Sequence, residues 1–285
     1  FAQRHGIDRQ TCLLGTGIAD DALSSGEGLV TRTQEMRLIE NLMLALPDDG
    51  AWGFELGLQY HLATFGVWGF ALRTCKTLRE AAILGVRYLP LSTAYCRIEL
   101  VEDDDTFGIT FDPDPIPPHL RQFLLERDMA TALNLVREIT LQGVDFRAID
   151  LAGQPDVSAQ VIQEECGVKP TFAARSNRIL VNRAGASQPF PGYDPVLTRM
   201  LEQQCQQRMD TVENSGIAGK VRQQLLGELG LGATLNDMAS ALALSSRSLR
   251  RKLEQEGTSY RDLVEEERRQ LALQLLTSTT MKIEE

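Results

Sequence analysis

The sequence contains few of the residues from which metal and redox sites are built. It has five cysteines and three histidines in 285 residues. The number of cysteines is odd and no two have CxxC spacing, which argues against a disulfide framework or a zinc site and fits a reducing cytoplasm. His5, His61 and His119 are not spaced to chelate a metal together. We therefore expect no metal and no cofactor.

Long apolar runs are also missing. No stretch reaches the roughly 20 apolar residues that cross a bilayer, and the first residues do not have a signal-peptide layout. Hydrophobic residues make up 43% of the chain and charged residues 24%, which is ordinary for a globular protein. We therefore expect a cytoplasmic protein with no membrane partner, long enough for two domains.

Catalytic motifs are absent as well. The sequence has no nucleophile elbow, no phosphate-binding loop and no HExxH. The acidic pair Asp103 and Asp104 falls in an expected hairpin turn, where solvent exposure is the ordinary outcome. An enzyme with a helical assembly tail thus has no positive support, and we predict that the protein is not an enzyme and has no catalytic residue.

Positive charge is scarce overall but locally concentrated. The net charge is −10, which by itself argues against a partner as acidic as DNA. Residues 215–285, however, carry ten Lys/Arg and ten Asp/Glu, so the acidity lies upstream. Residues 245–252 contain four positive charges and no negative one. Such a local basic face matters more for phosphate contact than the total charge does.

Residues 1–190 are predicted to form an α+β domain. Periodicity near 3.6 predicts helices at residues 33–46, 77–89, 120–141 and 157–166. Alternation of apolar and polar residues predicts strands at residues 94–100, 107–111, 145–149 and 178–181. The first two strands form a hairpin around an acidic turn. Glycines at Gly15–Gly17 and in Ser24–Gly28 interrupt the first 33 residues, and residues 52–70 are rich in glycine and aromatics.

Three prolines and a glycine in residues 188–195 place the end of the first domain near 190. A linker helix is expected within 191–214, followed by a polar hinge at Glu213–Gly219 and a helical domain over 215–285. One stripe of the linker helix contains Leu197, Leu201, Cys205 and Met209. It is either a dimer seam or a face that packs on its own domain.

Residues 234–256 read as two short helices joined by a tight turn. Leu235, Met238, Ala239 and Leu242 form a one-sided apolar stripe, and Leu249 with Leu253 forms the buried side of the second helix. A small residue in the first helix and a basic second helix are typical of a helix-turn-helix DNA reader.

Capping residues fix the boundaries of these helices. Thr234 with Asp237 makes a capping box for the first helix. Ser245 is positioned to cap the second, and Ser259 the third. Gly257 suits the left-handed residue that ends a helix.

The second helix carries the predicted DNA contacts. Arg247 and Arg251 stand opposite its leucines, with Ser248 to one side. These three are predicted to face base edges in the major groove, because arginine can bond two guanine acceptors at once. Arg250 and Lys252 lie at the flanks, where they would contact phosphates. The full predicted set is Ser245, Ser246, Arg247, Ser248, Arg250, Arg251, Lys252 and Gln255. The alternative is a basic, solvated helix in a bundle.

An aromatic cluster with one cation is the candidate effector site of the first domain. Apolar walls with a few polar anchors are the usual design of a ligand pocket, and an arginine can hold a carboxylate. The predicted residues are Tyr60, Phe65, Trp68, Arg73, Tyr88 and Tyr95. The alternative is that the aromatics are core and Arg73 is a surface residue.

The sequence resembles the AraC/XylS-type bacterial transcription regulators. Residues 248–276 (SLRRKLEQEGTSYRDLVEEERRQLALQLL) resemble their first helix-turn-helix and the linker helix after it, with matches at Arg268, Ala272, Leu275 and Leu276. Residues 13–18 (LLGTGI), 60–72 (YHLATFGVWGFAL) and 77–91 (TLREAAILGVRYLPL) resemble the subfamily whose N-terminal domain is of the arabinose-binding type rather than a cupin barrel. Regulators of ornithine use and of virulence share this layout.

Two positions depart from the family pattern. The family's DNA unit has two helix-turn-helix motifs, and this chain stops at Met281–Glu285, where the second would begin. We therefore expect the natural protein to continue beyond residue 285. The turn between the two helices usually holds a glycine, where this chain has Ala243. If that position is left-handed, alanine costs about 1 kcal/mol.

The resemblance implies an effector-binding and dimerising α+β domain followed by an all-α helix-turn-helix domain. The implied function is sequence-specific regulation of transcription under control of a small molecule. The implied partners are double-stranded promoter DNA, a small-molecule effector and a second copy of the chain, with RNA polymerase as a further candidate. The alternative is a DNA-binding regulator that protein partners control, with no small ligand.

Overall fold

The computed structural model describes residues 1–19, 30–47, 50–141, 143–154, 158–191, 193–214, 216–227 and 229–278. The predicted interruption at Ser24–Gly28 and the chain end at Met281–Glu285 lie outside these residues. The chain forms two compact units, Phe1–Gln206 and Gln207–Glu285. The division falls within a helix, α10 (Pro195–Asn214).

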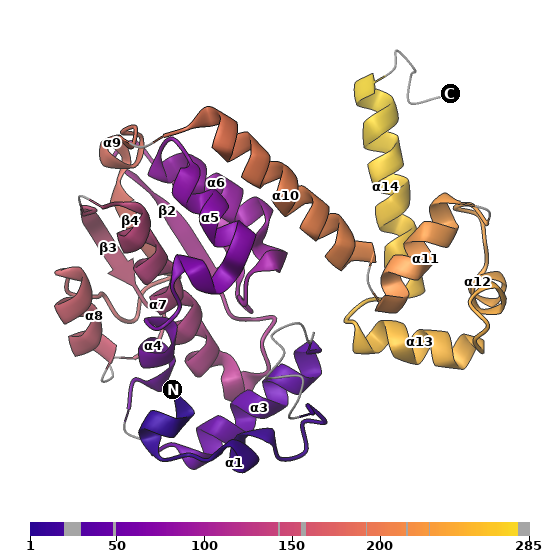
Figure 1. The fold of residues 1–285 in the computed structure, drawn as a ribbon, viewed down its shortest axis with the longest axis horizontal. Coiled ribbons are helices and arrows are strands. Elements are labelled where there is room, and N and C mark those ends of the chain that lie inside the picture. The colour runs from indigo at the N-terminus through magenta and orange to yellow at the C-terminus, as the bar shows by residue number, and fades with distance from the viewer. Residues whose placement is uncertain are drawn as a thin grey trace. The chain divides into compact units, whose positions relative to one another are not determined.

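The first unit is a mixed layer of helices and one sheet (Figure 1). Its α-helices before α10 are α1 Arg9–Leu13, α3 Arg32–Ala45, α4 Trp52–Gly57, α5 Gly66–Thr74, α6 Leu78–Arg87, α7 Arg121–Ile139, α8 Ser158–Cys166 and α9 Arg183–Ala186. Short 3-10 turns span Ala2–His5, Leu62–Phe65, Leu89–Leu91 and Pro118–Leu120. The four helices expected from periodicity are α3, α6, α7 and α8, each within two residues of its predicted ends.

The sheet has four strands, β1 Arg97–Glu102, β2 Thr106–Asp112, β3 Phe146–Asp150 and β4 Asn177–Asn182. Their order is β1-β2-β4-β3 and every pairing is antiparallel. The predicted hairpin is present, with Leu100 opposite Ile109. In its turn, the Asp103 carboxylate accepts hydrogen bonds from the backbone of Thr106 at 2.6 Å and of Asp105 at 3.0 Å. These bonds hold the pKa of Asp103 below its ordinary value.

Helix α7 is the centre of the first unit. It packs on β2, α5 and α4, while α6 packs on β1 and β2 (Figure 1). The α4 contact is close because α4 has glycines where it meets α7. A Cβ atom at Gly53 would lie 2.4 Å from Phe123 O, and one at Gly57 would lie 2.3 Å from Arg127 O.

A buried ion pair on α7 fixes the segment before β1. Arg127 is 1% exposed, and its Nη2 lies 2.9 Å from the Asp128 carboxylate. Arg127 also donates to Thr93 O at 2.5 Å. The other Asp128 oxygen accepts from the backbone amides of Tyr95 and Cys96, at 2.8 and 2.9 Å. The buried charges are thus paired and hydrogen-bonded, as the low-dielectric interior requires.

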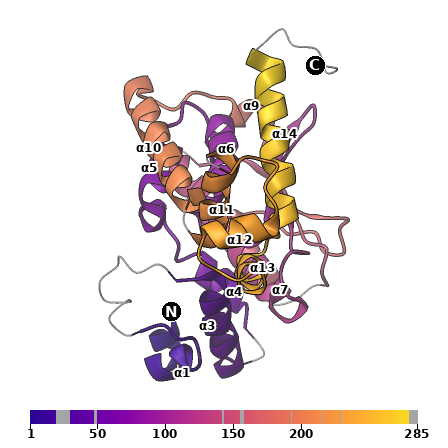
Figure 2. The ribbon, with the colours of Figure 1, turned by 90° about the vertical axis from the view of Figure 1, so that its right-hand side faces the viewer.

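The second unit is helical. It contains α11 Gly216–Leu226, α12 Leu235–Ala241, α13 Ser246–Gln255 and α14 Tyr260–Ser278, and Figure 2 views α13 nearly along its axis, next to α12. These helices share a core that includes Val221, Leu225, Met238, Leu249 and Leu263, each at most 2% exposed. The apolar stripe expected across residues 235–253 therefore faces inward.

The predicted hinge at Glu213–Gly219 is wrong over most of its length. Helix α10 continues to Asn214, and α11 already begins at Gly216, inside the predicted hinge. The early start has a physical cause that lies far away in sequence. The Glu256 carboxylate accepts hydrogen bonds from the amides of Ile217 at 2.8 Å and Ala218 at 2.9 Å. It thereby caps α11, a role suited to an anion at a helix N-terminus.

The cysteines are free thiols inside the structure. Four of them are buried and Cys166 is half-buried. Burial raises the pKa of Cys75 to about 12 and that of Cys166 to about 11. Among the described residues, no three His, Cys, Asp or Glu side chains gather as a metal site. No described helix is long and apolar enough to cross a membrane.

Candidate functional site

The turn between α12 and α13 has the backbone of a tight helix ending. The amides of Leu242, Ala243 and Leu244 donate to carbonyls of α12 at 3.1, 3.1 and 2.8 Å. Ala243 has a φ of 52°, in the left-handed region. The position is therefore one that glycine adopts at lower cost than alanine.

Both helices have the caps that the sequence predicts. Thr234 Oγ1 accepts from the Asp237 amide at 3.2 Å, and the Asp237 carboxylate accepts from the Thr234 amide at 2.9 Å. The hydrogen bonds from Thr234 hold the pKa of Asp237 below its ordinary value. Ser245 Oγ accepts from the Ser248 amide at 3.1 Å. The start of α13 is also joined to α12, because the Ser246 hydroxyl donates to Asn236 Oδ1 at 2.6 Å.

The outward face of α13 carries four cations without partners. Arg247, Arg250, Arg251 and Lys252 are exposed, and within the part of the chain that the structure describes none of them makes a side-chain hydrogen bond or ion pair. On the opposite side of α13, Leu249 is fully buried. The helix is therefore basic on one side and anchored on the other.

Three other arginines of the second unit are paired with glutamates. Arg261 lies 2.8 Å from Glu265, and Arg269 lies 2.7 Å from Glu266. Half-buried Arg222 lies 3.4 Å from Glu267. The four unpaired charges of α13 thus differ from these paired arginines, and they are available to an external anion such as a phosphate.

The remaining predicted DNA contacts have different surroundings. Ser245 and Gln255 are exposed, whereas Ser246 and Ser248 are half-buried. The hydroxyl of Ser245 donates to Ser248 Oγ at 2.9 Å, and that of Ser246 is engaged with Asn236. These serines shape the start of α13. Neither Asn236 nor Glu256 was singled out by sequence, since their roles depend on contacts between helices.

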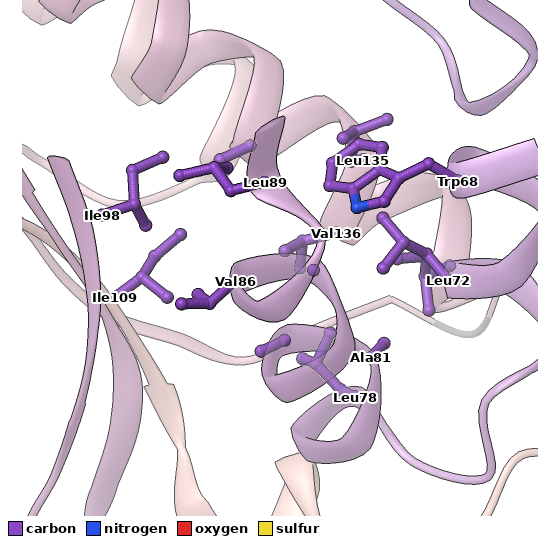
Figure 3. A pocket seen from close by; sticks show the side chains of 14 residues that line it. Trp68, Leu72, Leu78, Ala81, Val86, Leu89, Ile98, Ile109, Leu135 and Val136 are labelled. Atoms are coloured by element: carbon purple, nitrogen blue, oxygen red, sulfur yellow. The ribbon is translucent and has the colours of Figure 1, made fainter. Parts of the chain in front are cut away.

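The first unit contains an apolar cavity of about 100 Å³ (Figure 3). Its walls come from α5, α6, the 3-10 turn Leu89–Leu91, β1, β2 and α7, and they include Leu72, Val86, Ile98, Ile109 and Val136. Leu72 is buried, and the other four are half-buried. The cavity thus has a buried end and an end near the surface.

The six predicted effector residues lie in several places. Tyr60, Phe65 and Trp68 form an edge-to-face series, with ring centroids 6.0 and 5.2 Å apart. Of the six, Trp68 lines the cavity. Arg73 is exposed, and its guanidinium donates to Glu138 O at 2.5 Å.

The other two tyrosines are elsewhere in the first unit. The Tyr88 hydroxyl donates to Gln206 at 3.1 Å and that of Tyr95 to Glu35 at 2.7 Å. The Arg127 guanidinium lies over the Tyr95 ring, 5.2 Å from its centroid. A role for these residues in effector binding stays a prediction.

Comparisons with known proteins find a family match for the first unit and relatives along nearly the whole chain. Residues 6–190 match the family described as the arabinose-binding domain of AraC transcription regulators, N-terminal part. An uncharacterized HTH-type transcriptional regulator of Mycobacterium tuberculosis is 30% identical over 289 residues, covering 100% of this chain and 84% of that protein. The ornithine utilization regulator of Pseudomonas aeruginosa is 26% identical over 282 residues, covering 99% and 83%.

A solved structure has a similar fold. The transcriptional regulator CdpR from Pseudomonas aeruginosa matches with a TM-score of 0.50 and 21% identity, covering 93% of this chain and 86% of that one. The family match covers well over half of the described chain, and the regulators that resemble it do so along nearly its whole length. The chain belongs to the AraC-type transcription regulators that carry an arabinose-binding N-terminal domain.

Proposed function

We propose that the chain is a sequence-specific regulator that binds double-stranded promoter DNA through α13. The observation that carries this proposal is the set of four unpaired cations on the exposed side of α13, above a fully buried Leu249. Arg247 and Arg251 would read base edges, because a helix enters the major groove with its exposed face, and half-buried Ser248 would lie beside them. Arg250 and Lys252 would contact phosphates on either side.

The N-terminal end of α13 supplies further contacts. The first backbone amides of a helix have no partner within it and attract anions. Ser245 and Ser246 stand at this end, and we propose that they meet a phosphate there. Gln255, at the other end, would contact the DNA backbone or a base.

The proposed division of labour follows the order of the chain. Residues 1–190 would bind a small-molecule effector and dimerise, 191–214 would connect the domains, and 215–285 would bind DNA. The apolar cavity supports small-molecule control over control by protein partners alone, because a domain governed only by partners needs no internal cavity. Two copies are expected on one operator, since repeated or near-palindromic half-sites match a protein dimer.

The test is a promoter-fragment binding assay with full-length protein at two salt concentrations, with shuffled DNA of equal length as competitor. We expect binding to the promoter that resists the competitor and weakens with salt, by a log-log slope of about 0.9 per phosphate contact. Replacing the four cations of α13 by alanine should abolish it. Arg261→Ala and Arg269→Ala, which remove paired arginines of α14, are the matched controls and should bind normally. Binding without sequence preference would refute the proposal.

A further inference from the structure

The apolar cavity of the first unit contains one polar side-chain group, and that group lacks a partner. Trp68 is 5% exposed, and its Nε1 is buried without a hydrogen bond to any described residue. Figure 3 shows the indole nitrogen on the edge of the ring that faces the interior of the cavity. Buried N–H groups in proteins nearly always have an acceptor. The donor of Trp68 is therefore aimed at a space from which an acceptor can approach.

The rest of the wall is hydrocarbon. The cavity is lined by Leu, Ile, Val, Ala and Gly residues in addition to Trp68, and none of its lining residues carries a charge. A sugar would bring several hydroxyl groups, and all but one would lose their hydrogen bonds to water without replacement. A zwitterionic amino acid would bury two charges without a counter-charge. The cavity therefore selects against both classes.

The size of the cavity sets the size of the apolar group. At about 100 Å³ it is smaller than the engineered apolar cavity of roughly 150 Å³ that takes up benzene. A short alkyl chain fits such a space better than a fused ring system does. The end of a longer ligand would extend out of the cavity on its half-buried side, where Val86, Leu89 and Ile98 line it.

We propose that this cavity binds an uncharged alkyl carbonyl compound, such as a ketone or ester, whose carbonyl oxygen accepts a hydrogen bond from Trp68 Nε1. The alkyl chain lies between α6, α7 and the sheet. This inference rests on the proposed effector control and names the chemical class of the effector. In this proposal Trp68, and not Arg73, provides the polar contact to the ligand. Arg73 is exposed, donates a hydrogen bond to Glu138 O and does not line the cavity.

The position of the cavity connects it to α10. Helix α6 lines the cavity with Leu78, Ala81 and Val86, among others. Its C-terminal end is bonded to α10, through an ion pair between Arg87 and Glu202 at 2.7 Å and the hydrogen bond of Tyr88 to Gln206. A ligand that orders α6 thereby orders the first half of α10.

The indole N–H signals of the full chain provide a direct test. The sequence has two tryptophans, so protein labelled with ¹⁵N-tryptophan gives two indole signals, which Trp68→Phe assigns. The probe is 2-hexanone, with 2-methyl-1-hexene as a hydrocarbon of the same shape. We expect 2-hexanone to move the Trp68 proton downfield and the hydrocarbon to move it much less. The Trp52 signal should stay in place, since Trp52 Nε1 already donates to Pro47 O at 2.7 Å.

Two variants separate the hydrogen bond from the cavity. Trp68→Phe should weaken the binding of 2-hexanone about tenfold, as expected for one lost hydrogen bond, and leave the binding of the hydrocarbon nearly unchanged. Saturation-transfer NMR on the signals of the probes measures both affinities, because this variant lacks the Trp68 signal. Gly85→Ala adds a methyl group 3.4 Å from Leu72 Cδ2 and 3.8 Å from Trp68 Cζ2, without a clash. Gly85→Ala should weaken the binding of both 2-hexanone and the hydrocarbon. Gly185→Ala, in α9 and outside the cavity, is the matched control and should weaken neither.

Several outcomes would overturn the inference. The Trp68 signal could fail to move with 2-hexanone, or the Gly85→Ala variant could bind 2-hexanone as tightly as the unmodified chain does. The Trp68 signal could also respond to L-arabinose or L-ornithine instead. The promoter assay keeps this failure distinct from that of the proposed function. Promoter binding without a ketone response refutes the effector class alone. If the ketone moves the Trp68 signal but the chain does not bind DNA, ligand binding in the cavity is supported and the proposed regulatory function is refuted.

Discussion

Ala243 occupies a backbone position that favours glycine. Its φ of 52° lies in the left-handed region, where a Cβ atom crowds the backbone. We predict that Ala243→Gly raises the free energy of unfolding of the second unit by about 1 kcal/mol, less the added entropy of the unfolded chain. Urea unfolding followed by circular dichroism measures this change.

A matched substitution two residues earlier should have the opposite sign. Ala241 is the last residue of α12 and has helical backbone angles. Ala241→Gly should lower the free energy of unfolding by about 0.5–1 kcal/mol. If Ala243→Gly and Ala241→Gly both lower the free energy of unfolding, the left-handed geometry at Ala243 is not what limits the stability of this turn.

Arg251 and Lys252 are neighbours with different predicted tasks. Arg251→Ala should relax base preference at one operator position, at a cost of about 1–3 kcal/mol for the preferred sequence. Lys252→Ala should weaken binding to all sequences evenly and reduce the salt slope by about 1. Binding titrations against a set of single-base operator variants distinguish the two. Identical profiles would mean that the assumed face of α13 is turned the wrong way.

At the scale of elements, sequence predicts helices well because their signals are local. The predicted helix at 33–46 is α3, and the predicted caps at Thr234 and Ser245 are present. The hairpin illustrates the limit. Its first strand was expected from residue 94 and begins at Arg97, because Asp128 takes the amides of Tyr95 and Cys96. The Asp128 side chain on α7, distant in sequence, thus takes the backbone amides that the strand would otherwise use for pairing. No local sequence pattern reveals that contact.

The order of the strands and the walls of the cavity are equally non-local. Strand β4 lies between β2 and β3, a pairing that depends on which distant strands meet. The cavity takes residues from six elements, and its aliphatic lining looks in sequence like ordinary core. Trp68 was recognised as an aromatic candidate. Its unpaired N–H, which gives it chemical meaning, is visible only in three dimensions.

The Tyr88–Gln206 hydrogen bond and the Arg87–Glu202 ion pair differ in burial, and we therefore expect them to contribute differently to stability. Tyr88 is 4% exposed, so Tyr88→Phe should cost about 1 kcal/mol and speed amide exchange over residues 199–206. The Arg87 side chain is 57% exposed, so Arg87→Ala should cost well below 1 kcal/mol. Hydrogen exchange with mass spectrometry measures both. Equal protection in wild type and Tyr88→Phe would show that α6 does not hold α10.

At the scale of the whole molecule, the chain combines an acidic total charge with a basic helix. Under the proposed function, the net charge of −10 is a poor guide to the partner, because the proposed DNA contacts include four cations of α13. If the proposal holds, an acidic body would repel DNA except where α13 presents its cations. This arrangement would favour one orientation of approach over general adhesion to the duplex.

The cysteines allow a prediction for the whole chain. Their pKa values are raised by burial, so at pH 7.5 the thiols remain protonated and inaccessible. We predict that the native protein reacts very slowly with Ellman's reagent and that five thiols react once it is unfolded in guanidinium. Cys166, half-buried and with a pKa of about 11, should react first, and faster as the pH rises. Rapid reaction of several native thiols would contradict the burial described.

These silent thiols have a practical consequence. A cysteine introduced on exposed α13, for example by Glu254→Cys, would be the fastest-reacting nucleophile in an otherwise native chain. A fluorophore or spin label could then be attached without first removing the natural cysteines. In the proposed dimer on DNA, the separation of two such labels would become a spectroscopic ruler, readable with and without a compound in the cavity.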